Sequence, residues 1–492
     1  MLCFVSITLL FLDFTGTLHH WLGWMAKIQL LPAVLALNFI VIAALVVITL
    51  IFGRIYCSVI CPLGVMQDLI SWIHSRRKKN RFSYSKEIKW LRYPLLLLLI
   101  VAIVLGIGSL VSLLDPYSTY GQIATNLFQP VYLWCNNGLA AIAEHYNSYT
   151  FYSVDVWIKS ITALVLSASL LIIIAILAWY GGRTYCNTLC PVGTLLSLLS
   201  RFSLLKIHID DDKCIKCGLC TRNCKSSCID YKNGTVDHSR CVTCGNCIEK
   251  CNKDAIYYGR PRKAAVAPIE PQNQEGIDKG KRAFLIGSGI ALATTAMAQA
   301  KKKVDGGLAA IEEKKMPQRK NPITPPGSIS ARNMLKHCTA CQLCVAECPN
   351  QVLHPSNNLL TLMQPIMSYE RGYCRPECNR CSQVCPAGAI KPISLEEKSS
   401  TQIGHAVWTH FLCIPTRDKD DDGNPISCGN CARHCPTGAI TMMPLDENDE
   451  KSPMVPSINE AKCIGCGACE YVCPSRPVSA IHVEGHEDHR TI

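Results

Sequence analysis

The sequence predicts an α-helical membrane domain of four spans, followed by α+β ferredoxin domains of the bacterial two-cluster type. Three observations support this prediction: long apolar runs before residue 181, a high cysteine content, and the short repeated spacing of those cysteines. Of 492 residues, 31 are Cys, 49% are hydrophobic and only 17% are charged. This hydrophobicity excludes a disordered chain, and the length excludes a small disulfide scaffold.

The residue pattern divides the chain into four parts. Residues 1–206 are expected to form the membrane domain, 207–262 a ferredoxin domain with two clusters, 263–337 a linker, and 338–492 a ferredoxin domain with four clusters. The formal charge of +12 lies mainly beside the apolar runs. This placement favours membrane topology over nucleic-acid binding.

Four apolar segments are long enough to cross about 30 Å of hydrocarbon at about 1.5 Å per residue. They are Met1–Leu18, Ala33–Phe52, Leu95–Leu114 and Ser160–Tyr180. Basic residues gather between the second and third segments, from Arg76 to Arg92. Because positively charged loops stay in the cytoplasm, we expect a multi-pass protein of the bacterial inner membrane with both ends of the four-span unit inside.

Two acids are candidates for proton chemistry. Asp13 lies in the first apolar segment, where an acid is a functional candidate, although an interface position on a tilted helix is the alternative. Asp115 lies just after the third segment and has a turn or helix-end role as its alternative. Haem is not expected, because no His lies in the middle of any apolar segment.

A short motif repeats at the ends of the second and fourth apolar segments. Residues 53–64 and 182–193 share Gly, Arg, Tyr, Cys-x3-Cys-Pro and a final Gly, so a duplicated two-helix unit is the economical explanation. Pseudo-symmetric packing of the halves would bring together Cys57, Cys61, Cys186 and Cys190. These cysteines could ligate an additional cluster, form a redox-active pair or simply terminate two helices.

The next cysteines follow the spacing of bacterial two-cluster ferredoxins. The runs are Cys214-x2-Cys217-x2-Cys220-x3-Cys224 and Cys241-x2-Cys244-x2-Cys247-x3-Cys251. In such ferredoxins the fourth Cys of each run ligates the other cluster. We therefore expect one [4Fe–4S] site made of Cys214, Cys217, Cys220 and Cys251, and a second made of Cys241, Cys244, Cys247 and Cys224. Zinc is disfavoured, because its sites use separated Cys pairs or mixed Cys and His sets.

The C-terminal region repeats this pattern with two irregular gaps. Cys374 and Cys378 are separated by three residues instead of two, and Cys413 and Cys428 by 14. Exchange of fourth ligands predicts four more sites: Cys338, Cys341, Cys344 and Cys385; Cys374, Cys378, Cys381 and Cys348; Cys413, Cys428, Cys431 and Cys473; and Cys463, Cys466, Cys469 and Cys435. In total, 24 cysteines are predicted as iron ligands of six [4Fe–4S] clusters.

The linker contains a segment that resembles an export signal. Lys281-Arg282-Ala283-Phe284-Leu285 precedes a mild apolar run that ends in Ala298-Gln299-Ala300. This resembles a twin-arginine signal with Lys in place of the first Arg, and a short span or an amphipathic anchor is the alternative. Export would place residues 338–492 in the periplasm, while 207–262 stays in the cytoplasm.

The motifs resemble a known group of proteins. Residues 1–260, with the Cys-x3-Cys-Pro pair and two cluster motifs, resemble the NapH-type membrane ferredoxin of periplasmic nitrate reductase systems. Residues 280–492 look like the NapG-type four-cluster ferredoxin. The chain therefore resembles a fusion of the two. The resemblance implies that the membrane part oxidises quinol and passes electrons through the clusters to a periplasmic reductase.

We therefore expect a membrane-bound iron–sulfur electron-transfer protein that oxidises quinol, with Asp13 or Asp115 taking up protons. Its expected partners are quinone or quinol, an oxidoreductase or c-type cytochrome, and the membrane, but not nucleic acid. One alternative is a cytoplasmic conduit between a soluble donor and the quinone pool. Another is an assembly or sensor factor in which Cys57, Cys61, Cys186 and Cys190 perform thiol or copper chemistry.

Overall fold

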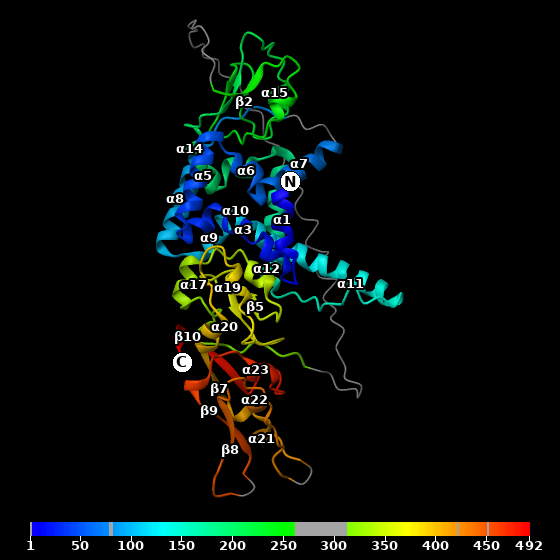
Figure 1. The fold of residues 1–492 in the computed structure, drawn as a ribbon, viewed down its shortest axis with the longest axis vertical. Coiled ribbons are helices and arrows are strands. Elements are labelled where there is room, and N and C mark those ends of the chain that lie inside the picture. The colour runs from blue at the N-terminus through cyan, green and yellow to red at the C-terminus, as the bar shows by residue number, and fades with distance from the viewer. Residues whose placement is uncertain (1, 78–81, 261–311, 421–422, 450–451) are drawn as a thin grey trace.

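The computed structural model describes residues 2–77, 82–260, 312–420, 423–449 and 452–492. The molecule is elongated and has three parts (Figure 1). A helical layer formed by the N-terminal 200 residues lies in the middle. A small ferredoxin region, residues 206–259, lies at one end, and the C-terminal region, residues 316–492, at the other. The predicted signal at 281–300 lies outside the described residues.

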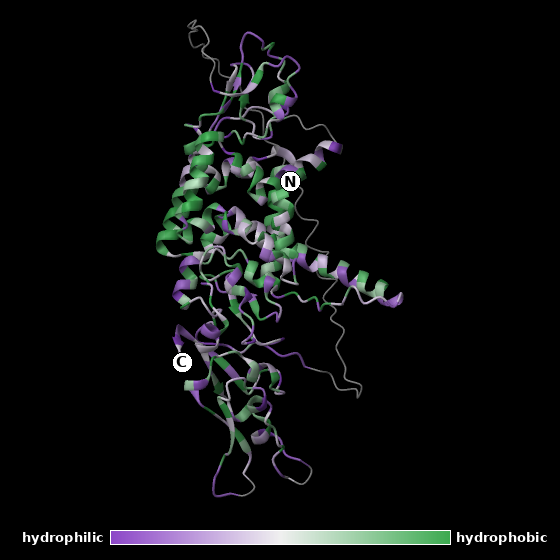
Figure 2. Ribbon diagram, viewed as in Figure 1, coloured by the Kyte–Doolittle hydropathy of each residue, from purple (hydrophilic) through white to green (hydrophobic). Residues whose placement is uncertain are grey.

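The helical layer is built from helices that range from 4 residues in α3 to 21 residues in α12. Its elements are α1 (Leu2–Leu12), α2 (Thr17–Leu22), α3 (Trp24–Lys27), α4 (Leu30–Leu35), α5 (Phe39–Phe52), α6 (Ile55–Val59), α7 (Pro62–Arg77), α8 (Lys89–Leu105), α9 (Gly108–Leu114), α10 (Pro116–Ile123), the π-helical η1 (Ala124–Phe128), α11 (Gln129–His145), α12 (Ile161–Gly181), α13 (Thr184–Thr188) and α14 (Pro191–Ser200). Most of these helices are coloured as apolar in Figure 2.

The prediction of four membrane spans is wrong. Among the described residues, only α12 is long and apolar enough to cross a membrane. The first predicted span ends early because the Asp13 carboxylate accepts hydrogen bonds from the backbone N–H groups of Thr15, Gly16 and Leu18, which forms a turn. The second breaks at Asn38, which caps α5. The third breaks at Gly106, whose φ is +72°.

The small ferredoxin region has the expected α+β form. Its elements are β1 (Lys206–Ile209), α15 (Leu219–Arg222), β2 (Ile229–Asp230), β3 (Thr235–Val236), α16 (Asn246–Glu249) and β4 (Ile256–Gly259). Strand β1 pairs antiparallel with β4, and β2 pairs with β3. Ile207, Ile229 and Ile256 form a small core with the neighbouring cysteines. This region therefore has a hydrophobic core of its own.

The C-terminal region combines short helices with three two-stranded antiparallel sheets, β5–β6, β7–β10 and β8–β9. Its elements are α17 (Ala331–His337), α18 (Leu343–Glu347), β5 (Leu353–Pro355), β6 (Pro365–Met367), α19 (Arg380–Val384), α20 (Leu395–Ser400), β7 (Thr401–Trp408), η2 (His410–Leu412), α21 (Ile414–Arg417), α22 (Asn430–Arg433), β8 (Ile440–Pro444), β9 (Met454–Ile458), η3 (Glu460–Lys462), α23 (Ala468–Val472) and β10 (Ile481–Thr491).

The helical layer and the C-terminal region share one hydrophobic core. Phe11 of α1 and Tyr117 of α10 are buried in the same cluster as Leu343 and Val345 of α18. Helix α10 lies directly against the first C-terminal cysteine loop, because the Gln122 side-chain amide donates to the carbonyl of Ala340 at 3.3 Å. These two parts are therefore one folding unit, although about 100 residues separate them in sequence.

Candidate functional site

The cysteine loops are curled by residues with positive φ. In each run of standard spacing, these are the second and fourth residues after the first Cys. They are Lys216 and Gly218, Thr243 and Gly245, Ala340 and Gln342, and Gly465 and Gly467. Residues other than Gly rarely adopt this conformation, and such strain tends to occur at functional sites. The repeated turn lets three sulfurs of one loop face the same point.

The first predicted quartet lines a single cavity. Cys214, Cys217, Cys220 and Cys251 surround a space of about 160 Å³ in the small ferredoxin region. Cys251 comes from the second run, so the structure brings it to the first run, as exchange of fourth ligands predicts. Three of these four cysteines are half-buried and Cys217 is exposed. This site therefore lies near solvent at one end of the molecule.

The second quartet gathers around buried cysteines of the same region. Burial raises the pKa of Cys247, and the thiolates of Cys241, Cys224 and Cys244 raise it further. The fifth cysteine here is Cys228, whose sulfur lies 3.5 Å from that of Cys224. The sequence placed Cys228 in no quartet. Its spacing, four residues after Cys224, gave no signal that the chain folds it back onto the site.

The C-terminal quartets are brought together in the same exchanged manner. Cys413, Cys428, Cys431 and Cys473 line a cavity of about 30 Å³. Helices α21 and α22, which begin just after Cys413 and Cys428, lie toward the end of the molecule opposite the small ferredoxin region (Figure 1). Burial raises the pKa of Cys338, and Cys385 from the second run raises it further. Burial and then Cys463 and Cys374 raise the pKa of Cys466 to about 12, so the quartets containing Cys374 and Cys466 are neighbours.

The longer gap between Cys374 and Cys378 has a structural reason. The buried Lys398 ammonium donates to the carbonyls of Arg375 and Cys378, which fixes the turn that contains the additional residue. The 14-residue gap after Cys413 holds α21 and an excursion closed by a bridge between Lys419 and Pro425. The backbone of both irregular loops therefore follows a different path from that of the loops with standard spacing.

Cys57, Cys61, Cys186 and Cys190 converge in the helical layer. All four are buried, with 3–4% of each exposed. Burial raises the pKa of Cys190, and Cys186, Cys61 and Cys57 raise it further, so the four thiols are close neighbours. Each Cys-Pro pair begins a helix, α7 or α14, at its proline.

Each half of this four-cysteine site supplies an arginine that is hydrogen-bonded to the other half. Arg54 of the first half donates to the carbonyl of Cys186 at 3.2 Å, and Arg183 of the second half donates to the carbonyl of Cys57 at 2.6 Å. Both arginines are fully buried. A Cβ on Gly64 would lie 2.3 Å from the carbonyl oxygen of Cys57, so the final Gly of the motif permits this close packing. The repeat contained both arginines, but no local pattern showed that they cross.

The two predicted acids are buried at helix ends. Asp115 caps α10 by accepting hydrogen bonds from the backbone N–H and hydroxyl of Ser118 at 2.9 and 2.6 Å. Burial raises the pKa of Asp115 to about 6. Asp13 lies in the turn after α1, and the next residue, Phe14, lines a cavity. The proton roles of both acids stay predictions.

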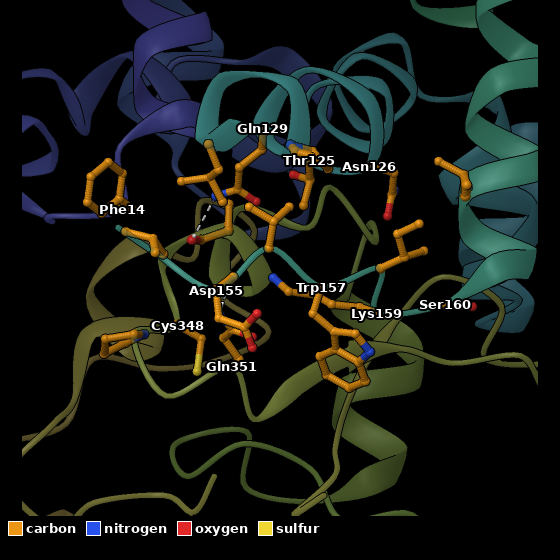
Figure 3. Close-up of a pocket in the computed structure, with 18 of the residues that line it drawn as sticks. Phe14, Thr125, Asn126, Gln129, Asp155, Trp157, Lys159, Ser160, Cys348 and Gln351 are labelled. Atoms are coloured by element: carbon orange, nitrogen blue, oxygen red, sulfur yellow. Dashed lines mark hydrogen bonds between the residues drawn. The ribbon is translucent and has the colours of Figure 1, made fainter. Parts of the chain in front are cut away.

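This cavity, of about 240 Å³, lies between the helical layer and the C-terminal region. Figure 3 shows that Gln129, Trp157, Lys159 and Cys348 surround it. Lys159 is held by a hydrogen bond to the carbonyl of Val345 at 2.7 Å, and burial lowers the pKa of Lys159 to about 8. The sequence did not indicate this cavity, because its walls come from segments about 200 residues apart.

The cysteine spacing suits iron–sulfur clusters rather than single metal ions. Zinc sites use separated Cys pairs or mixed Cys and His sets, whereas [4Fe–4S] clusters are held by Cys runs of the spacing found here. The fold and these cysteine sites define an iron–sulfur electron-transfer protein.

Comparison with known proteins supports this class. A family model described as "4Fe-4S binding domain" matches residues 34–81 and 163–210, and two models described as "4Fe-4S dicluster domain" match 237–352 and 426–476. This chain is a [4Fe–4S] ferredoxin-type protein, related to ferredoxin-type proteins such as NapF. The predicted family resemblance is confirmed at this level, and the number of six clusters stays a prediction.

Three relatives illustrate the similarity. YccM of Escherichia coli K12, named for electron transport, is 28% identical over 203 residues, which are 40% of this chain and 48% of YccM. The methylamine utilization ferredoxin-type protein MauN of Methylobacillus flagellatus is 26% identical over 174 residues, 35% of this chain and 48% of MauN. NapF of E. coli K12 is 25% identical over 185 residues, 37% of this chain and 99% of NapF. The chain spans about half the length of YccM and MauN.

Proposed function

We propose that this chain is attached to a bacterial membrane, oxidises quinol and passes the electrons to a partner reductase or c-type cytochrome. The observation that carries this proposal is the cavity beside Cys348, a predicted cluster ligand (Figure 3). Its volume of about 240 Å³ is below the roughly 300–1,000 Å³ of sites for drug-sized ligands, and suits a ring head group. A quinol bound there would adjoin an electron acceptor.

The cavity offers groups for both parts of the chemistry. Oxidation of quinol releases two electrons and two protons, and [4Fe–4S] clusters held by cysteines supply one-electron acceptors. The Lys159 ammonium has three donors and uses one on Val345, so it can orient a quinol oxygen. Asp155, whose side chain is 72% exposed, connects the cavity to water and would pass protons outward.

Apolar surface on the helical layer supports attachment to a membrane. Only 22% of the most apolar part of α12 is buried. Ile161, Val165 and Ile173 of this helix are more than half exposed. Exposed apolar surface on this scale marks contact with lipid or protein. We assign it to lipid because α12 has the length that a bilayer requires.

The two ferredoxin parts lie on opposite sides of the helical layer (Figure 1). This arrangement supports placing residues 207–262 in the cytoplasm and 338–492 in the periplasm. The quartet of Cys413, Cys428, Cys431 and Cys473 adjoins α21 and α22, which lie away from the helical layer (Figure 1), and three of its members are half-buried. We assign the exit to the partner to this end.

The test is anaerobic reduction of the purified full chain by a menaquinol analogue, followed by cluster bleaching and EPR. Lys159→Gln is expected to slow reduction by quinol at least tenfold, while reduction by dithionite is unchanged. Lys462→Gln, at an exposed lysine of η3, is the matched control and should behave as the unchanged protein.

Two outcomes would overturn the proposal. If dithionite reduces the clusters but quinol does not, quinol is not the donor. If a reporter fused after Ile492 is active only in the cytoplasm, the C-terminal region does not deliver electrons outside. The second result would favour a conduit between a soluble donor and the quinone pool.

A further inference from the structure

We propose that Cys57, Cys61, Cys186 and Cys190 together hold one more [4Fe–4S] cluster, which carries electrons between the small ferredoxin region and the C-terminal region. The two segments matched as "4Fe-4S binding domain" would thus form one shared site. This inference goes beyond quinol oxidation and does not depend on it.

Polar groups are aimed at the sulfurs of this site. The Gln67 side-chain amide lies 3.2 Å from the sulfur of Cys186, and the backbone N–H of Gly193 lies 3.3 Å from that of Cys190. A guanidinium nitrogen of Arg54 lies 3.8 Å from the sulfur of Cys57. Such N–H donors stabilise cluster thiolates and tune their potential. The Gly193 contact also caps α14, whereas the donors from Gln67 and Arg54 have no role at a helix end.

The charge of the surroundings suits an anionic cluster. Arg54 is fully buried, its partners are two carbonyls, an amide and a sulfur, and no carboxylate pairs with it among the described residues. Its Nε has no hydrogen-bond partner there. A buried cation without a counter-charge is costly. Four thiolates around a 2+ core carry about two negative charges, which would compensate Arg54.

Arg183 is compensated differently. It forms a bidentate pair with Asp68, at 2.9 and 2.6 Å, and Lys225 also lies 3.6 Å from this carboxylate. Arg183 and Lys225 therefore exceed Asp68 by about one positive charge. Together with Arg54, the surroundings have an excess of about two positive charges, which is the sign that an anionic cluster requires, and Arg54 and Arg183 also act on Cys241 and Cys244 of the neighbouring quartet.

The site lies between the two ferredoxin parts. On one side, Arg54 donates to the carbonyl of Ser239 at 3.0 Å, two residues before Cys241. Asn187 likewise donates to the carbonyl of Ser226 at 3.2 Å, two residues after Cys224. The four-cysteine site is thus hydrogen-bonded directly to the loops of the second quartet.

On the other side, α10 separates the site from Cys341. A Cβ on Gly121 would lie 2.2 Å from the carbonyl oxygen of Cys341, so this helix packs directly on the cysteine loop. Tyr117 of α10 is fully buried. Burial raises the pKa of Tyr117, and the charges of Cys341 and Asp115 raise it further. Residues of one short helix therefore fill the space between two predicted clusters.

The electron balance is simple. Each transfer would oxidise the donor cluster by one electron and reduce the acceptor cluster from 2+ to 1+, and the next transfer would return it to 2+. No bond forms or breaks, and no proton has to move. The four cysteines serve only as ligands.

The test counts iron and sulfide in the full chain, purified anaerobically without quinol. Seven clusters correspond to about 28 iron atoms per chain and six to about 24. Cys57→Ala and Cys186→Ala are each expected to lose about four iron and four sulfide atoms, with a matching loss of EPR spins after reduction. Cys135→Ala, at an exposed cysteine of α11 outside every quartet, is the control and should keep all of them.

A second variant applies even if the cysteine variants do not fold. Gln67→Leu removes the donor to Cys186 and introduces the residue found at the equivalent position of the other half, Leu196. It is expected to lower the potential of one cluster signal while iron content stays unchanged. About 24 iron atoms in the unchanged protein, disulfides among the four cysteines, bound copper, or an unaltered set of potentials in Gln67→Leu would each overturn the inference.

Discussion

The two ferredoxin parts are attached to the helical layer in opposite ways. Residues 206–259 directly follow that layer in sequence, yet they have their own core. They are joined to the layer by Val242, which is buried in the core of that layer, and by hydrogen bonds such as those from Arg54 and Asn187. Residues 316–492 are distant in sequence, yet Leu343 and Val345 share a core with α1 and α10. Proximity in sequence therefore does not determine which parts fold together. An extensive apolar interface makes one unit, and a smaller interface of Val242 and hydrogen bonds joins a second unit to it.

The largest expected effect comes from breaking a buried ion pair far from the helical layer. Glu470 accepts hydrogen bonds from Arg319 at 2.6 Å and from the backbone N–H of Val483 at 2.9 Å, and both charged side chains are almost fully buried. Glu470→Gln leaves Arg319 without a counter-charge and should cost about 3–5 kcal/mol. If the core is shared, anaerobic urea unfolding should show the helices and the C-terminal region melting together at a lower midpoint.

Separate transitions of these two parts would contradict the shared core. The control is Glu487→Gln, which breaks a pair with Arg332 in which both side chains are more than 60% exposed. Because exposed pairs are weak, this change should cost about 1 kcal/mol or less.

Cavity-forming substitutions test whether the two cores are independent. Leu343→Ala and Ile229→Ala should each lower the free energy of unfolding by about 2–5 kcal/mol, because both side chains are almost completely buried. None of the eight Trp residues lies within 206–259. Tryptophan fluorescence should therefore report earlier unfolding in Leu343→Ala only, whereas Ile229→Ala should make residues 206–259 sensitive to protease. A fluorescence change in Ile229→Ala would show that the small region is part of the larger unit.

The two units should also differ in their response to pH. Burial raises the pKa of Asp115 to about 6, above its unfolded value of about 3.9, so its stabilising protonated form is lost as pH rises through 6. Between pH 4 and 8, the free energy of unfolding of the unchanged protein should fall by up to about 3 kcal/mol relative to that of Asp115→Asn. Asn is the suitable replacement because it keeps the helix cap. Urea midpoints at pH 4, 5, 6.5 and 8 measure this loss of stability, and most of the loss should fall between pH 4 and 6.

Asp237 of the small region is the matched control. Burial opposes ionisation there, but hydrogen bonds from Ser239 and Arg240 lower the pKa of Asp237. Its contribution is present above the unfolded pKa and is lost only as the pH falls through the lower folded value. Asp237→Asn should therefore leave the slope between pH 5 and 8 unchanged, and a changed slope would contradict the assignment.

The smallest effect is expected at the rim of the apolar interface. Arg371 of the C-terminal region pairs with Asp155 at 2.7 Å and lies 4.6 Å from the ring centre of Trp157. Because Asp155 is largely exposed, Arg371→Met should cost about 0.5–1 kcal/mol in thermal unfolding. A loss larger than Leu343→Ala would show that charges, not apolar packing, hold this interface.

The cysteine pattern was predictable because it is local. Three ligands of each standard loop lie within seven residues, so spacing such as Cys214-x2-Cys217-x2-Cys220 indicates the site directly. The helix lengths were not predictable from apolar runs alone. Asp13, Asn38 and Gly106 interrupt those runs through turns and caps, which hydropathy averages conceal.

The cavity beside Cys348 and the surroundings of the four-cysteine site depend on contacts between distant segments. Lys159 reaches Val345, and Gln67 reaches Cys186 more than 100 residues away. Nothing in the neighbouring sequence distinguishes these residues from ordinary surface lysines or helix glutamines. Tertiary packing alone gives them their positions.

The crossing of Arg54 and Arg183 has a consequence for ancestry. Each arginine serves the opposite repeat, so a single repeat carries an incomplete site, whereas two copies related by a twofold axis would complete each other. Formation of such a homodimer depends on the concentration of the protomers. Gene fusion removes that dependence because the two copies are then in one chain. Fusion also lets the two copies diverge. Here the first copy has Gln67 and Asp68, and the second copy has Leu196 and Ser197 at the equivalent positions.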